Sequence, residues 1–254
     1  MRKLLESNFN LSKTEFIAYL QCPLKFYLLK ELNKDIDKSK RKDYSDYEPN
    51  LVEGINKHLW YKTFYKKFGR KIQDESYLLS NSNLSEPWKK KFIDFEIKRY
   101  REQSSYWEPV ALELFLKTTE YRGQIDRIDQ LDEQGNCRIV EYKPHPSEFD
   151  EEELLFYSVL VNELLPLKEI QTVTKVSEIG VYYYSIGQFY KAKITAEKIQ
   201  TFGIYLKKIR RDMLNCYKIK KKKDCDLYST DCLYREICQR TGIKHQKIVE
   251  IPIK

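Results

Sequence analysis

Two carboxylates and one amine are spaced so that a single β-hairpin would bring them together. The segments 121–131 and 137–143 are rich in β-branched and aromatic residues, and turn residues separate them at 132–135. A hairpin closed by that turn places Asp126 directly opposite Glu141, and Lys143 projects from the same face. Two carboxylates so close resist ionising together unless a cation lies between them, and hard oxygen ligands suit Mg²⁺ or Mn²⁺.

Such a site would suit the hydrolysis of a phosphodiester bond. The metal would lower the pKa of a bound water and neutralise charge that develops on the phosphate, while Lys143 orients the water or stabilises the transition state. The simpler alternative is a cross-strand pair with a surface salt bridge. A one-residue bulge in either strand would also break the register.

The expected helices and strands supply a frame for this hairpin. Ser12 to Glu15 forms a capping-box pattern that predicts a helix up to Cys22. Apolar spacing predicts further helices over 51–68, 86–101, 150–164 and from 195 onward, and strands over 109–117, 121–131, 137–143, 179–184 and 188–194. The polar stretch 33–49 is expected to be a loop. These elements predict an α/β or α+β fold with a mixed central sheet flanked by helices.

The composition favours one folded domain. The chain has 254 residues, of which 41% are hydrophobic and 33% are charged, so it can bury a sizeable core. No apolar stretch is long enough to cross a membrane, and Glu6 and Asn8 interrupt the start before a signal peptide could form. We therefore expect a soluble cytoplasmic protein, with no membrane partner.

The positive charge is concentrated near the C-terminus. The chain carries 46 Lys and Arg against 38 Asp and Glu. Between 207 and 223 a single acidic residue, Asp212, accompanies a run of basic ones, namely Lys207, Lys208, Arg210, Arg211, Lys218, Lys220, Lys221, Lys222 and Lys223. Such a run is typical of a nucleic-acid contact, although a solvated helix end is an equally simple explanation.

The cysteines are also unevenly distributed. Of six cysteines, Cys137 lies in an expected strand and is interpreted as a buried unreactive thiol. Four others follow each other near the end, at Cys216, Cys225, Cys232 and Cys238. In a chain without a signal peptide, clustered thiols indicate a metal before they indicate disulfides. Four thiolates suit either a 4Fe–4S cluster or structural zinc.

The hairpin residues resemble a known catalytic core. Gly123-Gln-Ile-Asp126 followed by Ile139-Val-Glu141-Tyr-Lys143 resembles the PD-(D/E)XK nucleases, a group with a restriction-endonuclease-like core. The chain is most similar to the RecB-type branch, and within it to the CRISPR-associated RecB-like exonucleases.

Four further motifs carry the same resemblance. Gly54 to His58 resembles a helix motif whose histidine is a third metal ligand, and Glu153 to Tyr157 resembles the Gln-x-x-x-Tyr motif that arranges the active site and the nucleic acid. Leu11 to Pro23 resembles the "Cys-Pro" helix, and Cys232 to Cys238 resembles the closing cysteines of an iron–sulfur cluster. Glu113 matches an acidic position that often precedes the catalytic hairpin, and it is assigned no role.

The resemblance implies a set of roles. His58, Asp126 and Glu141 would hold Mg²⁺ or Mn²⁺, Lys143 would act on the water, and Glu153 and Tyr157 would complete the catalytic group. Cys22, Cys225, Cys232 and Cys238 would ligate a 4Fe–4S cluster that staples the two ends of the chain, with Cys216 as the alternative to Cys225. Two departures stand out, because Glu153 occupies the place of the family's glutamine and Ser229 that of a cysteine.

The implied protein is a single RecB-like nuclease domain over 1–254. Residues 1–30 would form the N-terminal helix with the first cluster cysteine, 51–194 the nuclease core, and 195–254 the C-terminal helix and cysteine-rich tail. The implied activity is a deoxyribonuclease, acting as an exonuclease on single-stranded DNA ends, and the implied partner is the CRISPR adaptation integrase. Two alternatives remain open: a DNA-binding or partner-docking protein with weak or no cleavage, which Glu153 favours, and a zinc-stapled protein.

Overall fold

The computed structural model describes residues 9–23, 26, 49–82, 85–146, 151–166 and 170–214. The chain divides into two compact units, one spanning Lys42–Tyr205 and the other joining Met1–Arg41 with Leu206–Lys254. The larger unit contains the hairpin predicted from the sequence, together with most of the predicted helices.

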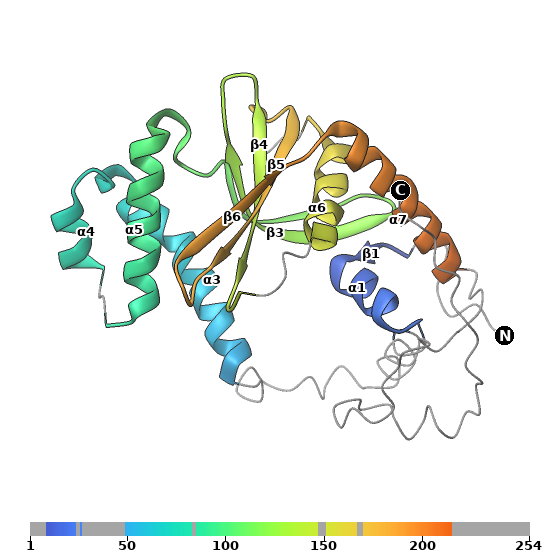
Figure 1. Cartoon of the computed structure of the whole chain (residues 1–254), viewed down its shortest axis with the longest axis horizontal. Coiled ribbons are helices and arrows are strands. Elements are labelled where there is room, and N and C mark those ends of the chain that lie inside the picture. Colours follow the sequence, from blue (N-terminus) through green and yellow to red (C-terminus); the bar gives the residue numbers. More distant parts are fainter. Residues whose placement is uncertain are drawn as a thin grey trace. The chain divides into compact units, whose positions relative to one another are not determined.

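A mixed sheet forms the centre of the larger unit (Figure 1). Its strands follow the spatial order β2-β3-β4-β5-β6, and they are β2 (Ala111–Lys117), β3 (Tyr121–Gln130), β4 (Asn136–Lys143), β5 (Lys175–Tyr183) and β6 (Gln188–Lys193). Neighbouring strands are antiparallel except β4 and β5, which are parallel and are joined through helix α6 (Glu151–Leu164). A parallel pair needs such a crossover, because a tight turn can only reverse the chain. The predicted mixed α/β architecture is confirmed.

The predicted register of the β3–β4 hairpin is confirmed over four pairs. These run from Arg127 opposite Val140 to Gln130 opposite Cys137. The regular ladder ends one pair before Asp126 and Glu141, at the point where the Asp126 carboxylate itself accepts the main-chain N–H of Tyr142 at 2.8 Å. No bulge interrupts these four pairs, so the alternation that placed both acids on one face holds up to that point.

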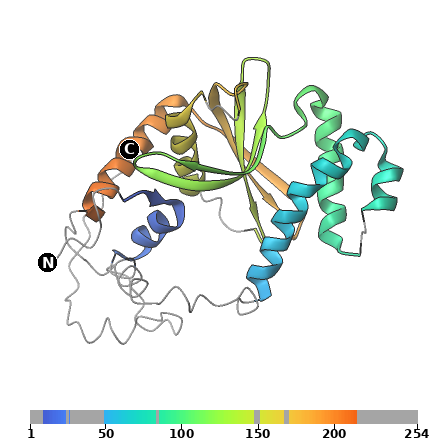
Figure 2. The ribbon, with the colours of Figure 1, turned by 180° about the vertical axis from the view of Figure 1, so that it is seen from behind.

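Helices α3 (Pro49–Phe68) and α5 (Pro87–Glu102) lie on one side of the sheet and α6 lies on the other, as two opposite views show (Figures 1 and 2). Helix α4 (Glu75–Asn81) packs beside α5, on the side away from the sheet, and short 3₁₀ turns at Gly69–Lys71 and Ser104–Tyr106 follow α3 and α5. The helices predicted over 51–68, 86–101 and 150–164 are confirmed to within two residues. Helix α4 was not predicted; its start is capped by Asp74, whose Oδ1 accepts the N–H of Tyr77 at 2.8 Å.

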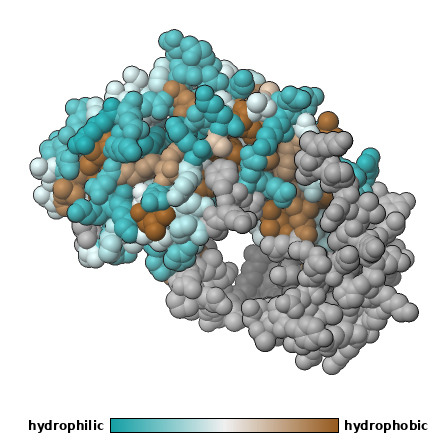
Figure 3. Space-filling view, viewed as in Figure 1, coloured by the Kyte–Doolittle hydropathy of each residue, from teal (hydrophilic) through white to brown (hydrophobic). Residues whose placement is uncertain are grey.

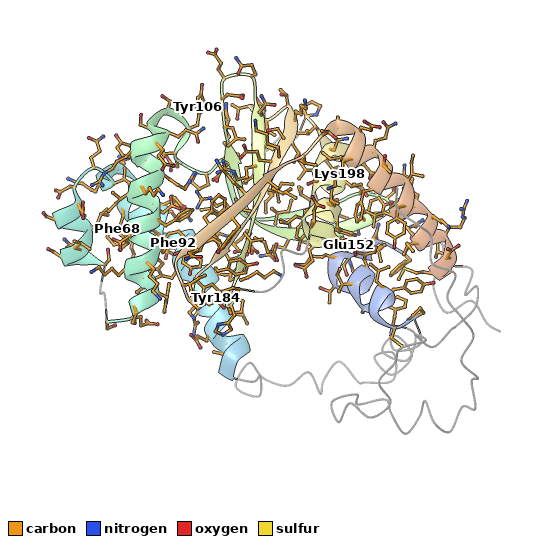
Figure 4. All side chains as sticks on the ribbon, in the orientation of Figure 1. Phe68, Phe92, Tyr106, Glu152, Tyr184 and Lys198 are labelled. Carbon is orange, nitrogen blue, oxygen red and sulfur yellow. The ribbon has the colours of Figure 1, made fainter. Side chains whose placement is uncertain are left out.

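Aromatic rings fill the space between α3, α5 and the sheet. Phe92 of α5, labelled in Figure 4, lies 4.3 Å from the ring of Tyr61 in α3 and 5.7 Å from that of Tyr182 in β5, measured between centroids. All three side chains are buried. Tilted and edge-on contacts of this kind add to the hydrophobic stabilisation of a core and fix how α3 lies on the sheet. Helix α3 supplies His58, so this packing also positions the histidine.

A network of buried charges crosses the same interface. Arg127 of β3 is fully buried; its Nη1 lies 2.7 Å from Glu96 Oε1 and its Nε 2.6 Å from Asp129 Oδ1. Arg99 binds the second oxygen of Glu96 at 2.7 Å, and Arg138 connects Asp129 to Glu178. Three arginines therefore face three carboxylates, and the network is electrically balanced.

In the smaller unit, the structure describes residues 9–23, 26 and 206–214. Helix α1 (Lys13–Gln21) follows the short strand β1 (Leu11–Ser12), and the predicted capping box is confirmed: Ser12 Oγ accepts the N–H of Glu15 at 3.3 Å, and Glu15 Oε2 accepts the N–H of Ser12 at 2.8 Å. Helix α7 (Ala196–Leu214) runs across the division between the units, and its predicted apolar stripe is buried at Ile199, Phe202, Leu206 and Met213. The expected loop at 33–49 lies outside the described residues except for Pro49, which begins α3.

The described helices include none that is both long enough and apolar enough to cross a membrane. On the face seen in Figure 3, hydrophilic residues cover most of the described surface, and hydrophobic residues form separate patches between them.

Candidate active site

Three side chains from three different elements meet at one edge of the sheet. His58 of α3 has its Nδ1 3.0 Å from Glu113 Oε1 of β2 and 3.5 Å from Asp126 Oδ1 of β3. One ligand atom of each residue lies within 4.8 Å of the others. This group, called the acidic cluster below, contains two of the predicted metal ligands and one residue to which the sequence assigned no role.

Asp126 is the most constrained member of the acidic cluster. Its Oδ2 accepts the N–H of Tyr142 at 2.8 Å, which leaves Oδ1 directed towards His58. Burial raises the pKa of the Asp126 carboxyl well above its usual range, and the negative charge of Glu141 raises it further. The Asp126 charge is therefore costly to maintain, and a cation bound beside it would remove much of that cost.

Glu113 lies opposite Asp126 in the β2–β3 pairing. It falls between the pairs Leu112–Arg127 and Leu114–Ile125, and its backbone has a φ of 51°. A glutamate in this left-handed conformation costs on the order of 1 kcal/mol or more, and such strain is concentrated at functional sites. The turn at 118–120 carried a signal for this arrangement, because pairing β2 with β3 across that turn places Glu113 beside Asp126.

His58 is held between the carboxylates and a ring. Its imidazole lies edge-on to Tyr142 at 5.6 Å between centroids, and 27% of its side chain is exposed. Burial alone would lower the pKa of His58, but the hydrogen bond to Glu113 and the charges of Asp126, Glu113 and Glu141 raise it above its ordinary value. Because histidine binds a metal through a neutral nitrogen, protonation and metal binding compete at this ring.

Lys143 lies beside the acidic cluster and has two carboxylate neighbours. Its Nζ is 3.7 Å from Glu141 Oε1, and it forms a closer ion pair and hydrogen bond with Glu153 of α6. Glu141, Lys143 and Glu153 are thus brought together as the sequence motifs predicted. The unexpected feature is the direct pairing of Lys143 with Glu153, the residue that stands in place of the family's glutamine.

Tyr157 of α6 packs against the strand that carries Asp126. A Cβ added to Gly123 would lie 2.8 Å from Tyr157 Cε1 and 3.4 Å from Leu160 Cδ2, so only glycine allows this approach. The ring of Tyr157 is buried. The contact between Tyr157 and Gly123 fixes how α6 packs on β3, and the predicted role of Tyr157 in the site stays a prediction.

Replacing Gly123 with alanine should destabilise the fold by about 1–3 kcal/mol, because the buried Tyr157 ring has to move away from the new methyl group. Urea unfolding of the purified protein measures this loss. Gly54→Ala in α3 is the matched control, since a Cβ there meets nothing within 4 Å and should stabilise the helix by about 0.5–1 kcal/mol. Equal stability of the Gly123→Ala variant and the wild type would contradict the contact.

The donor set fits a hard divalent cation. The acidic cluster offers two carboxylates and one imidazole, and Glu141 adds a third negative charge close enough to shift the pKa of both Asp126 and His58. Oxygen-rich sets with one nitrogen suit Mg²⁺ or Mn²⁺. The raised pKa of Asp126 points the same way, because burial and the nearby charge of Glu141 both disfavour its ionised form, which a bound cation would favour.

The other predicted site residues are described in part. Cys22 is the C-cap of α1, whereas Cys216, Cys225, Cys232, Cys238, Lys218 and Lys220–Lys223 lie outside the described residues. On α7, Lys207, Lys208 and Arg211 are exposed, and the guanidinium of Arg210 donates to the carbonyl of Phe9 at 2.8 and 3.0 Å. Cys137 is buried, and burial raises the pKa of its thiol to about 12, as befits an unreactive thiol.

Comparisons with known proteins gave a structural match and a family match. A crystal structure of a candidate exonuclease from Eubacterium rectale aligns with 96% of this chain and 91% of its own, with 11% sequence identity and a TM-score of 0.47. No curated protein sequence matches the chain significantly. The model of the PD-(D/E)XK nuclease superfamily matches residues 10–239, which is almost the whole chain. The chain therefore belongs to the PD-(D/E)XK nuclease superfamily.

Proposed function

We propose that this protein is a metal-dependent deoxyribonuclease of the cytoplasm that hydrolyses phosphodiester bonds at the ends of single-stranded DNA. The observation that carries the proposal is the acidic cluster, in which buried Asp126, His58 and Glu113 each bring a ligand atom within 4.8 Å of the others. Membership of a nuclease superfamily supports the same chemistry. The raised pKa of Asp126, caused by burial and by the charge of Glu141, is typical of a functional carboxylate.

His58, Glu113, Asp126 and Glu141 are the residues that would hold the metal. When bound, Mg²⁺ or Mn²⁺ lowers the pKa of water and offsets the charge of the phosphate. Hydrogen bonds hold two of these side chains, Asp126 and His58, in place before a metal binds. The Tyr142 N–H fixes the Asp126 carboxylate at 2.8 Å, and Glu113 Oε1 fixes the Nδ1 side of the His58 ring at 3.0 Å.

Lys143 is the positively charged side chain that we expect to contact the attacking water or the phosphate. Its Nζ can donate a hydrogen bond to the attacking water or to a phosphate oxygen, which stabilises the negative charge of the transition state. In this conformation, however, Glu153 accepts a hydrogen bond from the same ammonium group. Substrate must therefore compete with Glu153 for Lys143, and this competition would set part of the rate.

A nuclease assay on end-labelled single-stranded DNA with Mn²⁺ tests the proposal. Wild type should cleave, chelation of the metal should stop cleavage, and Asp126→Ala and Lys143→Ala should each lose activity. Glu133→Ala, which removes an exposed acid at the β3–β4 turn, is the matched control and should cleave normally. Equal rates in all four proteins would refute the proposal.

Replacing Glu153 with glutamine should raise kcat several-fold. Glutamine keeps the length of the side chain but removes the charge that holds Lys143, so the ammonium becomes available to the substrate. The rate at saturating DNA measures this effect, and Glu152→Gln, at the neighbouring position of α6, serves as the control. A lower kcat in the Glu153→Gln variant would show that the ion pair is part of the working site.

A second function has one observation in its favour. The pairing of Lys143 with Glu153 would also fit a DNA-binding or partner-docking protein in which cleavage is weak or lost. The same assay separates the two, because such a protein would bind labelled DNA without shortening it. In that case the Glu153→Gln variant would bind more tightly, since one negative charge near the phosphate is removed.

The proposal includes a 4Fe–4S cluster held by Cys22, Cys225, Cys232 and Cys238, with Cys216 as the alternative to Cys225. Its support is the resemblance of the "Cys-Pro" helix and the closing cysteines to those of the RecB-type branch. Protein purified without oxygen should be brown and absorb broadly near 400 nm, and Cys232→Ser should remove the colour. Colourless protein containing zinc would instead identify a structural zinc site.

The resemblance to CRISPR-associated exonucleases also supports a role in trimming DNA fragments before their integration into an array. The partner would be the adaptation integrase. Co-purification with that integrase, and shortening of fragments supplied to the pair, would test this role. Fragments of unchanged length in the presence of active nuclease would argue for DNA repair instead.

A further inference from the structure

We propose that the exposed face of the β2–β3 hairpin is the track along which a single nucleic-acid strand approaches the acidic cluster. This inference rests on the proposed nuclease function and adds the substrate-binding subsite. The track consists of Phe115, Lys117, Arg122 and Gln124, all of which are exposed. We refer to it below as the hairpin track.

The pairing of the two strands places the hairpin track in line with the cluster. Residues directly opposite each other share a face, and so do residues two positions apart on one strand. Successive pairs on this face, moving away from the cluster, are Glu113 with Asp126, Phe115 with Gln124, and Lys117 with Arg122. The pairs follow each other at about 7 Å, which is close to the length of one nucleotide in an extended strand.

A hydrogen bond shows that the hairpin track and the cluster form one surface. Gln124 Nε2 donates to Glu113 Oε2, while Glu113 Oε1 contacts His58. The side chains of Gln124 and Glu113 therefore lie on the same side of the hairpin. A strand that occupied the site of the cluster would meet Gln124 and Phe115 next.

Phe115 is the large apolar side chain on the exposed face of the hairpin, and it lies in line with the acidic cluster. It is 60% exposed, whereas Leu116 and Ile125 on the opposite face of the hairpin are 5% and 0% exposed. The hairpin thus has an ordinary buried face and could complete its core without Phe115. An exposed ring beside a phosphodiesterase site can stack on an unpaired base, and such stacking tolerates any base.

The charges on the hairpin track favour the same ligand. Lys117 and Arg122 form the outermost pair, so two cations lie one repeat beyond the aromatic ring. Phosphates of a strand whose base stacks on Phe115 would reach these cations, and their attraction would depend on salt. A duplex already stacks its bases on each other, so the ring would discriminate in favour of single strands.

The test uses the full-length protein and a fluorescein-labelled single-stranded oligonucleotide. Binding is measured by anisotropy in a buffer with chelator, where cleavage cannot interfere. Phe115→Ala should weaken binding about tenfold, Phe115→Trp should retain it, and Lys117→Glu should weaken it and reduce its salt dependence. Duplex binding should be unchanged in Phe115→Ala. DNA and RNA strands are compared in parallel to identify the preferred sugar.

Tyr190→Ala and Lys193→Glu are the matched controls, because both side chains are exposed on strand β6. Thermal unfolding checks that each variant folds. Wild-type affinity in both hairpin-track variants would overturn the inference, and so would wild-type protein that binds no oligonucleotide. A Phe115→Ala variant altered only in self-association would also overturn it, by identifying the face as a protein contact.

The outcome for the hairpin track is separable from that of the proposed nuclease. Asp126→Ala should lose cleavage and keep single-strand binding, whereas Phe115→Ala should raise KM with little change in kcat. If wild type fails to cleave but binds strands in a Phe115-dependent way, the nuclease proposal fails and the hairpin track stands. If cleavage requires Asp126 but not the hairpin track, the nuclease proposal stands and the hairpin track fails.

Discussion

Replacing Asp126 with asparagine should abolish cleavage and, in metal-free buffer, make the folded protein more stable. Asparagine keeps the shape of the side chain and an oxygen for the Tyr142 N–H, but it removes a buried charge beside Glu141. We expect a loss of at least about 10³-fold in kcat/KM, because the charge that would hold the metal is gone. The melting temperature should rise by about 2 °C or more.

The pH dependence of this stabilisation is a sharper check. The pKa of Asp126 is higher in the folded than in the unfolded chain, so the wild type binds the extra proton when folded and loses stability as the pH rises towards the folded pKa. The advantage of Asp126→Asn should therefore be larger at pH 8 than at pH 5. Glu133→Gln at the exposed turn is the control. An Asp126→Asn variant that melts below wild type at pH 8 would contradict the interpretation that the buried Asp126 charge destabilises the folded protein.

Replacing Arg127 with methionine should destabilise the protein by about 3–5 kcal/mol. Arg127 is 0% exposed, and its removal leaves buried Asp129 without its closest cation and takes from buried Glu96 one of its two arginine partners. Such a loss is a large part of the total stability of an ordinary domain, which is about 5–15 kcal/mol. Urea unfolding followed by circular dichroism measures it.

The control for Arg127→Met is Lys198→Met, which breaks a pair with Glu151 in which both side chains are exposed, by 46% and 37%. Exposed pairs contribute about 0–1 kcal/mol, so this variant should stay close to wild type. A double variant, Arg127→Met with Glu96→Leu, should recover part of the stability, since it removes a carboxylate left without Arg127. If Arg127→Met were as stable as Lys198→Met, the network would have no role in holding α5 to the sheet.

The sequence predicted most of the framework because the signals were local. The turn at 132–135 and the alternation of β3 and β4 were sufficient to fix the register at four pairs, and the capping box at Ser12 fixed the start of α1. Both signals arise from residues that are close together in the sequence: the turn joins two adjacent strands, and the Ser12 and Glu15 side chains accept main-chain N–H groups three residues apart. The proximity of Asp126 to Glu141, and of Glu141 to Lys143, followed from the same register.

The rest depended on contacts between distant elements. Glu113 was noted in the sequence but given no role, because its contact with His58 also requires the left-handed backbone at Glu113 and the approach of α3, and neither of these has a local sequence signal. Glu96 was interpreted only as part of an amphipathic helix, yet it is fully buried and paired with Arg99 and Arg127. The roles of Cys225, Cys232 and Cys238 concern residues outside the described part of the chain, and they stay predictions.

The origin of the acidic cluster in α3, β2 and β3 has a consequence during synthesis of the protein. A ribosome completes α3 well before it reaches β3, so His58 emerges long before its carboxylate partners. A partly made or truncated chain cannot bind a cation in this way, because no single element contains more than one of the three groups. Any ability to damage nucleic acid would thus begin only once these distant segments have folded together.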